Sequence, residues 1–479
     1  MKTYKSYLTI TLSAVLSFVF FGCSHAPYSD SRSTYQDFAH KKNTREPAAR
    51  QKLTANVDFQ QPAIIDSFFT PPDASELSQR TRAAGSQMPF SKTDDPSLGH
   101  LPMVQHIGSA KPGTELNMII FNLSDRDVAQ ALVNAQARGV TTTVIIDHQH
   151  YCNSYPEETS TCPPEKGSSA GPSPNTKVNP TKQALDMLKA GKVTVVASSP
   201  KFSITHVKSF SYVSDDNVKT LVVTSMNQTR FGSIIRDFGV VTTDEAAYNE
   251  YQSVFQIDLQ NAKNSTKDEP TTLSDANLAW SPVNSDQKLV AVINAAPKNG
   301  VIEITVEEFM ASATDMITAL KTAADDRQVA VKILIPLCQD PSSGIQGENS
   351  ENMDQLIAFT TGADKSANID ARGLRGPPTA TNPYLHQKMI LVRDGDAAKT
   401  PLLAYVGSIN YSKNSLDEAR ELGIIFQADR GGPASQALQK IASNFVADWN
   451  GPGGKSEVDP HSKQAIKVTD KQTGLCQSH

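Results

Sequence analysis

One order of strands and helices occurs twice along the chain, and this repeat restricts the fold more than any other feature. The pattern strand, helix, strand runs through residues 114–147 and returns in residues 300–337. Strands that alternate with helices indicate an α/β domain with a largely parallel sheet. In the first helix the apolar side chains recur every three or four residues, and Ser124 or Asp125 is expected to cap its start. The sequence therefore predicts one α/β domain built twice.

Length and charge narrow the class of protein. At 479 residues the chain is too long for one ordinary core, so two domains are expected. The formal net charge of −5 offers no broad basic surface, whereas a protein that grips nucleic acid through its phosphates is usually positive. We therefore do not expect a nucleic-acid partner, although the net charge does not exclude a local basic groove.

The first residues have the pattern of an export signal. Lys2 and Lys5 precede an apolar run that ends at Gly22, and Cys23 follows directly. This junction resembles the lipobox of bacterial lipoproteins, which implies a signal peptide at residues 1–22 and a lipidated Cys23. The alternatives are a secreted protein that is cleaved nearby and a retained anchor helix. The expected location is the bacterial cell envelope (periplasm or outer membrane), with secretion as the other option.

The remaining cysteines fit an oxidising compartment. Cys152 and Cys162 flank a loop rich in Pro, Glu, Ser and Thr, where a local disulfide is expected. Cys338 and Cys476 are left over, and the sequence does not decide whether they pair.

Each half of the chain contains one H-x-K pattern on a strand. His206 and Lys208 stand 180 residues before His386 and Lys388. Alternate residues of a strand share a face, so each histidine points the same way as its lysine. A lone H-x-K is weak evidence, but two copies in two similar halves are strong evidence for a functional pair.

The same residue types follow each pair in the same order. Each half reads H-x-K, hairpin, S-x-N, acid and then G-[VI]-[VI]. The followers are Ser225, Asn227 and Asp237 in the first half, and Ser408, Asn410 and Glu421 in the second.

At this point the sequence resembles the phospholipase D superfamily, whose motif H-x-K-x4-D and then G-S-x-N occurs twice in bilobal members. The resemblance covers residues 98–452. It departs where Val213 and Arg393 replace the motif's aspartate, which is mainly structural in the family. Acidic residues fall slightly later, at Asp215, Asp216 and Asp394, and Thr224 replaces the first glycine of G-S-x-N.

The resemblance implies a fold and an organisation of the chain. We expect an α/β protein of two similar lobes, each a mixed, mostly parallel sheet flanked by helices, packed as a pseudo-two-fold dimer in one chain. The protein would be a monomer with one active site where the lobes meet. The predicted parts are a signal at 1–22, a flexible tether at 23–95, lobe 1 at 96–265, lobe 2 at 275–452 and a tail at 453–479.

The repeated residues suit the cleavage of a phosphodiester. Lysines, asparagines and serines can stabilise the charge on the phosphoryl oxygens without a metal. One histidine attacks phosphorus and the other donates a proton to the leaving oxygen. A carboxylate can hold each imidazole in the required tautomer. The resemblance implies His206 as nucleophile and His386 as acid and base, and these assignments place Lys208, Asn227, Lys388 and Asn410 in the cradle, with Ser225, Ser408, Asp237 and Glu421 in support.

A second group of polar residues has the side-chain types that bind metal ions. His148, His150 and Cys152 lie close in sequence, but a rim loop with a disulfide is the interpretation we favour. We expect no metal and no cofactor, and these histidines could contact a head group. The long loops at 152–180 and 338–384 are expected to cover the cleft.

The function expected from the resemblance is an exported, lipid-anchored phospholipase D that hydrolyses phospholipids to phosphatidic acid and a free head group. The partners are therefore a phospholipid and, through the N-terminal anchor, a membrane. Three alternatives stay open: transfer to an alcohol as in cardiolipin-synthase-like members, an exported endonuclease, and a binding lipoprotein that has lost the activity.

Overall fold

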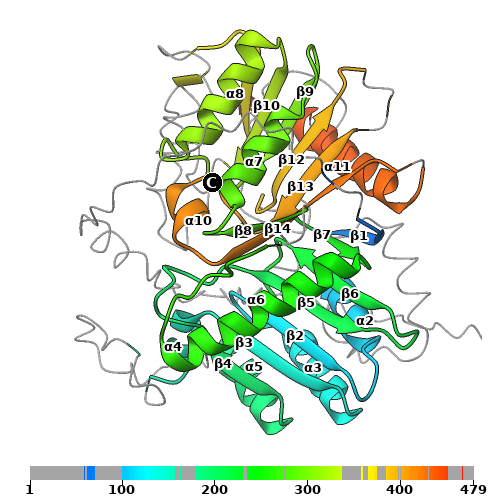
Figure 1. Cartoon of the computed structure of the whole chain (residues 1–479), viewed down its shortest axis with the longest axis vertical. Coiled ribbons are helices and arrows are strands. Elements are labelled where there is room, and N and C mark those ends of the chain that lie inside the picture. Colours follow the sequence, from blue (N-terminus) through cyan, green and yellow to red (C-terminus); the bar gives the residue numbers. More distant parts are fainter. Residues whose placement is uncertain are drawn as a thin grey trace, which may run out of the picture.

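Two lobes are stacked along the long axis of the molecule (Figure 1). Several predicted features lie outside the residues that the structure describes: the expected signal peptide, Cys23, Cys338, Cys476 and most of the two long loops. The computed structural model describes residues 59, 62–70, 100–156, 162, 179–229, 235–273, 277–336, 358–359, 365–374, 385–396, 399, 401–429, 431–450 and 466–467.

Lobe 1 is built on a seven-stranded sheet in the order β1-β7-β6-β5-β2-β3-β4. Only the segment β2-β3-β4 is parallel, and all other neighbours are antiparallel. The strands are β1 (Ile64–Thr70), β2 (Glu115–Ile120), β3 (Thr141–Ile146), β4 (Thr194–Ala197), β5 (Lys208–Val213), β6 (Lys219–Thr224) and β7 (Asp237–Thr242).

Lobe 2 repeats this order and adds one strand, giving an eight-stranded sheet in the order β15-β11-β10-β9-β12-β13-β14-β8. Parallel pairing is again confined to one segment, β9-β10-β11. The strands are β8 (Leu278–Ser281), β9 (Val301–Thr305), β10 (Ala330–Pro336), β11 (Ile369–Leu374), β12 (Lys388–Arg393), β13 (Leu403–Gly407), β14 (Glu421–Gln427) and β15 (Ile466–Lys467).

The prediction of two similar α/β lobes is confirmed, but the prediction that their sheets are mostly parallel is wrong. Only the strand–helix–strand segments are parallel, because a helical crossover is what lets successive strands run in one direction. The H-x-K strands β5 and β12 are joined to β6 and β13 by hairpins, which force antiparallel pairing.

Helices cover the outer face of each sheet. In lobe 1 they pack against a core that contains Leu132, Leu185 and Val144, and in lobe 2 against a core that contains Leu320 and Ile333. Asp125, not Ser124, caps α3, because its side chain accepts from the backbone N–H groups of Asp127 and Val128. The helices are α2 (Leu101–Gly108), α3 (Arg126–Ala137), α4 (His148–Ser154), α5 (Pro180–Ala190), α6 (Glu245–Asn264), α7 (Ser285–Asn294), α8 (Thr314–Asp326), α10 (Lys413–Asp417) and α11 (Pro433–Asn450). None of the helices in the described ranges is both long enough and apolar enough to span a bilayer.

A third core joins the two lobes. It contains Val240 of lobe 1 and Ile424 of lobe 2 and is closed by α6 and α11, through side chains such as Phe255 and Phe445. The inner faces of the two sheets therefore share one apolar interior.

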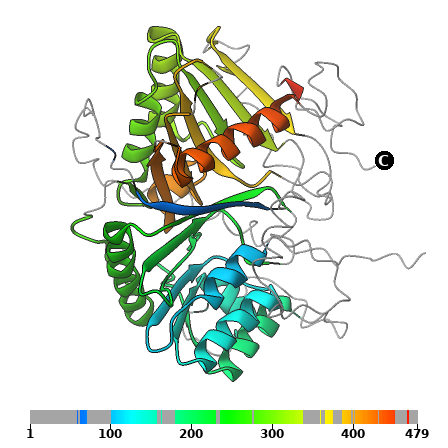
Figure 2. The same cartoon turned by 90° about the vertical axis from the view of Figure 1, so that its right-hand side faces the viewer.

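Part of the predicted tether belongs to the folded body. β1 pairs antiparallel with β7 and lies beside α11, as Figure 2 shows with β1 in blue and α11 in orange-red. Phe68 is fully buried, and the ring of Phe69 lies 4.4 Å from that of Phe238. These aromatic side chains explain why Ile64–Thr70 is a strand. In the predicted tail, β15 similarly pairs with β11.

Candidate active site

The ends of the H-x-K strands are joined to the opposite lobe through the backbone. The N–H of His206 donates to the carbonyl of Arg420 at 2.8 Å, and the N–H of His386 donates to the carbonyl of Arg236 at 3.0 Å. Each arginine directly precedes the acidic residue of its own half. The two exchanged contacts therefore place each histidine beside the acid of the other lobe.

The side chains repeat this exchange. Nδ1 of His206 lies 2.8 Å from Oε2 of Glu421, and Nδ1 of His386 lies 2.8 Å from Oδ1 of Asp237. A carboxylate on Nδ1 fixes the tautomer and leaves Nε2 as the nitrogen that can react. The predicted supporting acids thus orient the histidines, each across the interface between the lobes.

Both acids lie in the protein interior. Asp237 and Glu421 are fully buried, and the hydroxyl of Ser225 donates to Oδ1 of Asp237 at 2.5 Å. Burial raises the pKa of Glu421 to about 8, although Lys208 opposes the shift. The Glu421 carboxyl therefore keeps its proton to a higher pH than an ordinary carboxyl does.

The two lysines are also fully buried. Nζ of Lys208 donates to the carbonyl of His206 at 2.7 Å, and Nζ of Lys388 donates to the carbonyl of His386 at 2.6 Å. Burial lowers the pKa of Lys208 well below its ordinary value, while Glu421 raises it and Lys388 lowers it further. The charged groups of both halves thus act on one another within a single site.

The S-x-N residues have two different roles. Oδ1 of Asn410 accepts from the backbone N–H of Glu308 at 3.2 Å, which fixes the side chain beside the site. Oδ1 of Asn227 is buried and has no hydrogen-bond partner among the described residues. The hydroxyls of Ser225 and Ser408 instead accept from the backbone N–H groups of the residues that follow each acid, at 3.2 Å in both cases. The two serines therefore stabilise the starts of β7 and β14, the strands on which Asp237 and Glu421 lie.

Glu307 belongs to the site and was not predicted from the sequence. Its Oε2 lies 2.7 Å from Nζ of Lys388 and 3.5 Å from Nε2 of His386. It follows β9 at the position that Phe121 holds after β2. The ring of Phe121 lies 4.9 Å from that of His206. The only sign of Glu307 in the sequence is an acidic residue just after a predicted strand. The first half has Phe121 at the equivalent position, so the repeat does not point to Glu307.

Asp147 is a second residue that the sequence did not reveal. It follows β3, caps α4 and accepts from the backbone N–H of Thr205 at 2.8 Å. Burial raises its pKa to about 6, against its three backbone hydrogen bonds. Because Thr205 precedes His206, Asp147 connects α4 to the segment that carries the first H-x-K pattern.

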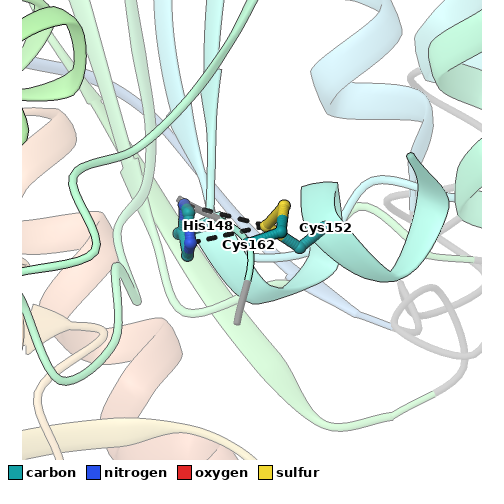
Figure 3. Close-up of side chains that lie close together, drawn as sticks. All are labelled: His148, Cys152 and Cys162. Atoms are coloured by element: carbon teal, nitrogen blue, oxygen red, sulfur yellow. Dashed lines mark hydrogen bonds between the residues drawn. A yellow bond between two sulfur atoms is a disulfide. The ribbon is translucent and has the colours of Figure 1, made fainter. Parts of the chain in front are cut away.

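The polar group near position 150 is divided between two environments. A disulfide joins Cys152 to Cys162 beside His148, whose Nε2 lies 3.4 Å from the sulfur of Cys152 (Figure 3). A disulfide sulfur cannot serve as a thiolate ligand. The ring of His150 lies 4.5 Å from that of Phe121, and burial lowers its pKa to about 4. These three residues therefore do not form one metal centre with the cysteines oxidised.

One other cluster within the described residues could hold a metal by its ligand types, namely His100, Asp125 and Asp127. Asp125 already caps α3 with Oδ1.

The late aspartate of the second motif lies in the hairpin after β12. Oδ1 of Asp394 accepts from the N–H of Asp396 at 2.9 Å, and Gly395 has a positive φ of 91°. Arg393, which stands at the motif position, instead contacts Glu303 at 3.4 Å within the sheet. Asp394 therefore shapes the turn and takes no part in the site.

Comparisons with known proteins agree with this architecture. The sequence matches the family described as cardiolipin synthase, PLD-like domain, once at residues 103–259 and again at 289–449. No curated protein matches the sequence at a significant level.

Several solved structures are similar to this chain at low sequence identity, and the phosphatidylserine synthase among them supports the same fold. Phosphatidylserine synthase from Haemophilus influenzae has a TM-score of 0.52 and 10% identity, over 81% of this chain and 88% of that chain. Polyphosphate kinase from Porphyromonas gingivalis has a TM-score of 0.46 and 13% identity over 75% of this chain, which spans only 45% of the kinase. Nuc, a phospholipase D family member from Salmonella typhimurium, has 20% identity and a TM-score of 0.25, over 35% of this chain and 89% of that chain.

Proposed function

Because the chain belongs to the phospholipase D superfamily, we propose that it hydrolyses phospholipids to phosphatidic acid and a free head group. One observation carries this proposal. Each of the two histidines is held through Nδ1 by a buried carboxylate of the opposite lobe. Two imidazoles oriented in this way, with two buried lysines beside them, supply a nucleophile, an acid and a cation cradle in one place.

The reaction has two steps. Nε2 of His206 attacks phosphorus, the bond to the head-group oxygen breaks, and Nε2 of His386 gives its proton to that oxygen. His386 then takes a proton from water, whose oxygen attacks phosphorus and displaces Nε2 of His206. Lys208 and Lys388 stabilise the phosphoryl oxygens in both transition states.

A second candidate is transfer of the phosphatidyl group to an alcohol, because the matched family is described as cardiolipin synthase. The first step is the same, and an alcohol replaces water in the second. The proposed lipid anchor at Cys23 places either reaction beside a bilayer.

Product analysis separates these reactions. Purified protein is incubated in EDTA with vesicles of phosphatidylcholine, phosphatidylethanolamine or phosphatidylglycerol, with and without added ethanol, and with single-stranded DNA in a separate arm. Phosphatidic acid without ethanol and phosphatidylethanol with it are expected if water and alcohols compete for the intermediate. A phosphatidyl product only when alcohol is present favours the transferase, and DNA cleavage alone contradicts both lipid reactions.

The two-histidine mechanism is tested with His206→Ala and His386→Ala, each expected to lower turnover by about a thousandfold or more. His106→Ala is the matched control, since His106 also contacts a carboxylate, Asp66 at 3.2 Å, but lies outside the site. Normal turnover in either catalytic variant contradicts the mechanism, and complete loss of activity in EDTA indicates a metal.

A further inference from the structure

One carboxylate oxygen fills the place where substrate should bind in lobe 2. Oε2 of Glu307 lies 2.7 Å from Nζ of Lys388, 3.5 Å from Nε2 of His386 and 3.5 Å from Nδ2 of Asn410. These are the lysine, histidine and asparagine that the proposed reaction directs at a phosphoryl group. Three such groups around a single oxygen mark the position that a phosphoryl oxygen would take.

In lobe 1 the equivalent position is occupied by Phe121, an aromatic residue in place of the acid. Ile119 pairs with the residue that follows Lys208, and Thr305 pairs with the residue that follows Lys388. Phe121 and Glu307 each lie two residues further along the chain, so they occupy equivalent places. The ring of Phe121 lies 5.1 Å from Nζ of Lys208. The two halves of the site therefore differ most clearly in one pair of residues, an aromatic ring against a carboxylate.

Glu307 changes the charge that the site presents to a ligand. Asp237, Glu421 and Glu307 all act on the buried lysine Lys208, and Glu307 also contacts the buried lysine Lys388. Asp237 and Glu421 each hold a histidine, whereas Glu307 stands against the phosphoryl position itself. A phosphodiester carries one negative charge, but a phosphomonoester carries up to two above about pH 6. Like charges at this range repel strongly when they are shielded from water.

We propose that Glu307 is a specificity-determining residue that admits monoanionic phosphodiesters and rejects dianionic phosphomonoesters. The inference rests on the proposed function and deepens it, because it names the charge class of the substrate. The Glu307 carboxylate leaves the phosphoryl position when a diester binds, and a second charge on the ligand increases the cost of that exchange. Phosphatidic acid, a monoester, would be expelled by the same repulsion.

Direct binding tests this inference without any turnover. Methyl phosphate and dimethyl phosphate are titrated calorimetrically into the wild-type protein and Glu307→Gln at pH 8. We expect the variant to bind methyl phosphate about tenfold more tightly than the wild type, and to gain less than half of that factor for dimethyl phosphate. At pH 5, where methyl phosphate has one charge, the difference between the two ligands should disappear.

Two further variants keep the test interpretable. Glu245→Gln removes the same charge from an exposed glutamate that also pairs with a lysine, Lys219, and should bind both ligands as the wild type does. Glu307→Asp keeps the charge and should still reject methyl phosphate. Thermal unfolding shows whether each variant is folded.

An equal gain for both ligands, or no gain for methyl phosphate in a folded Glu307→Gln protein, overturns the inference. A loss of affinity for both ligands also overturns it, because Glu307 would then only position Lys388. These outcomes are independent of the product analysis: a protein that shows the charge preference and hydrolyses no lipid contradicts the proposed function alone.

Discussion

Each histidine of the site depends on a carboxylate that the opposite half of the sequence supplies. Asp237 and Glu421 are buried, contact Nδ1 of their histidines and are separated from them by 149 and 215 residues in sequence. An acid in this position selects the tautomer and stabilises the imidazolium that forms during the reaction. The acids should therefore affect kcat far more than substrate binding.

We expect Asp237→Asn to lower kcat by about a hundredfold or more with little change in KM, since an amide permits the wrong tautomer of His386. Steady-state kinetics on vesicles measure the effect. Asp66→Asn is the control, because Asp66 contacts His106 outside the site. A variant that keeps its kcat shows that the contact between His386 and Asp237 does not orient a reacting group.

Glu421 should make stability depend on pH. Its pKa rises from an ordinary 4.5 to about 8 through burial, so between these values the folded state binds more protons than the unfolded state. The free energy of unfolding therefore falls as pH rises through this window. Glu421→Gln removes this contribution and should flatten the slope.

The comparison is best made from pH 6 to pH 8 by urea unfolding. Burial also raises the pKa of Asp147 and Asp258 to about 6, and their contribution is confined to lower pH. Equal slopes for the wild type and the variant in this range mean that Glu421 is already ionised in the folded protein.

The sequence reveals which residues are repeated but not which of them touch. The H-x-K, S-x-N and acidic positions were predictable because both halves contain them. The exchange of acids between lobes was not, because no local pattern records how two lobes pack. Glu307 was missed for the opposite reason: it is the place where the repeat fails, and a single acid after a strand is most often a surface residue.

At the level of elements, the hairpin after β12 depends on one glycine. Gly395 has a φ of 91°, and a Cβ there would clash with the carbonyl oxygen of Asn299. Gly431 has a similar φ of 87° with no atom within 4 Å of such a Cβ. An alanine at Gly431 would meet only the strain of a positive φ, whereas an alanine at Gly395 would meet that strain and a steric clash.

We expect Gly431→Ala to lower the free energy of unfolding by about 1 kcal/mol, the ordinary cost of a positive φ. Gly395→Ala should cost about 1–3 kcal/mol more, because the turn must also move. Urea unfolding measures both. Equal costs would show that the hairpin absorbs the new methyl group without strain.

Sequence patterns predicted some elements better than others. Helix α3 of lobe 1, helix α8 of lobe 2 and the parallel strands beside them follow from local periodicity. This strand–helix–strand part of each lobe was predicted correctly. The antiparallel strands that carry the site are set by hairpins, and the alternation of strands and helices does not indicate this antiparallel part of each sheet. β1 is a short apolar run in a polar segment, and its partner β7 lies far away in sequence. Such long-range pairing leaves little local signal.

At the scale of the whole molecule, two arginines form ion pairs between the lobes in addition to the shared apolar core. Arg420 of lobe 2 is fully buried and contacts Asp258 of α6 at 3.0 Å. Arg236 of lobe 1 contacts Asp448 of α11 at 2.8 Å, and its side chain is 20% exposed. Each arginine directly precedes the acid of the site, so the same short segments fasten the lobes and position the histidines.

Arg420→Met should therefore lower the free energy of unfolding by about 3–5 kcal/mol, because Asp258 would be left buried without its partner. Arg236→Met breaks the equivalent pair at a more exposed place and should cost less.

The shared core makes the two lobes one cooperative unit, so both variants should still unfold in a single step. Trp449 lies in lobe 2, and Trp280 of lobe 2 contacts Glu250 and Tyr251 of lobe 1. Fluorescence therefore reports from lobe 2 and from the interface, while far-UV circular dichroism reports from both lobes. Coincident urea transitions by the two probes are expected. A separate second transition in the dichroism would show that lobe 1 stays folded after lobe 2 has unfolded, which contradicts a single cooperative unit.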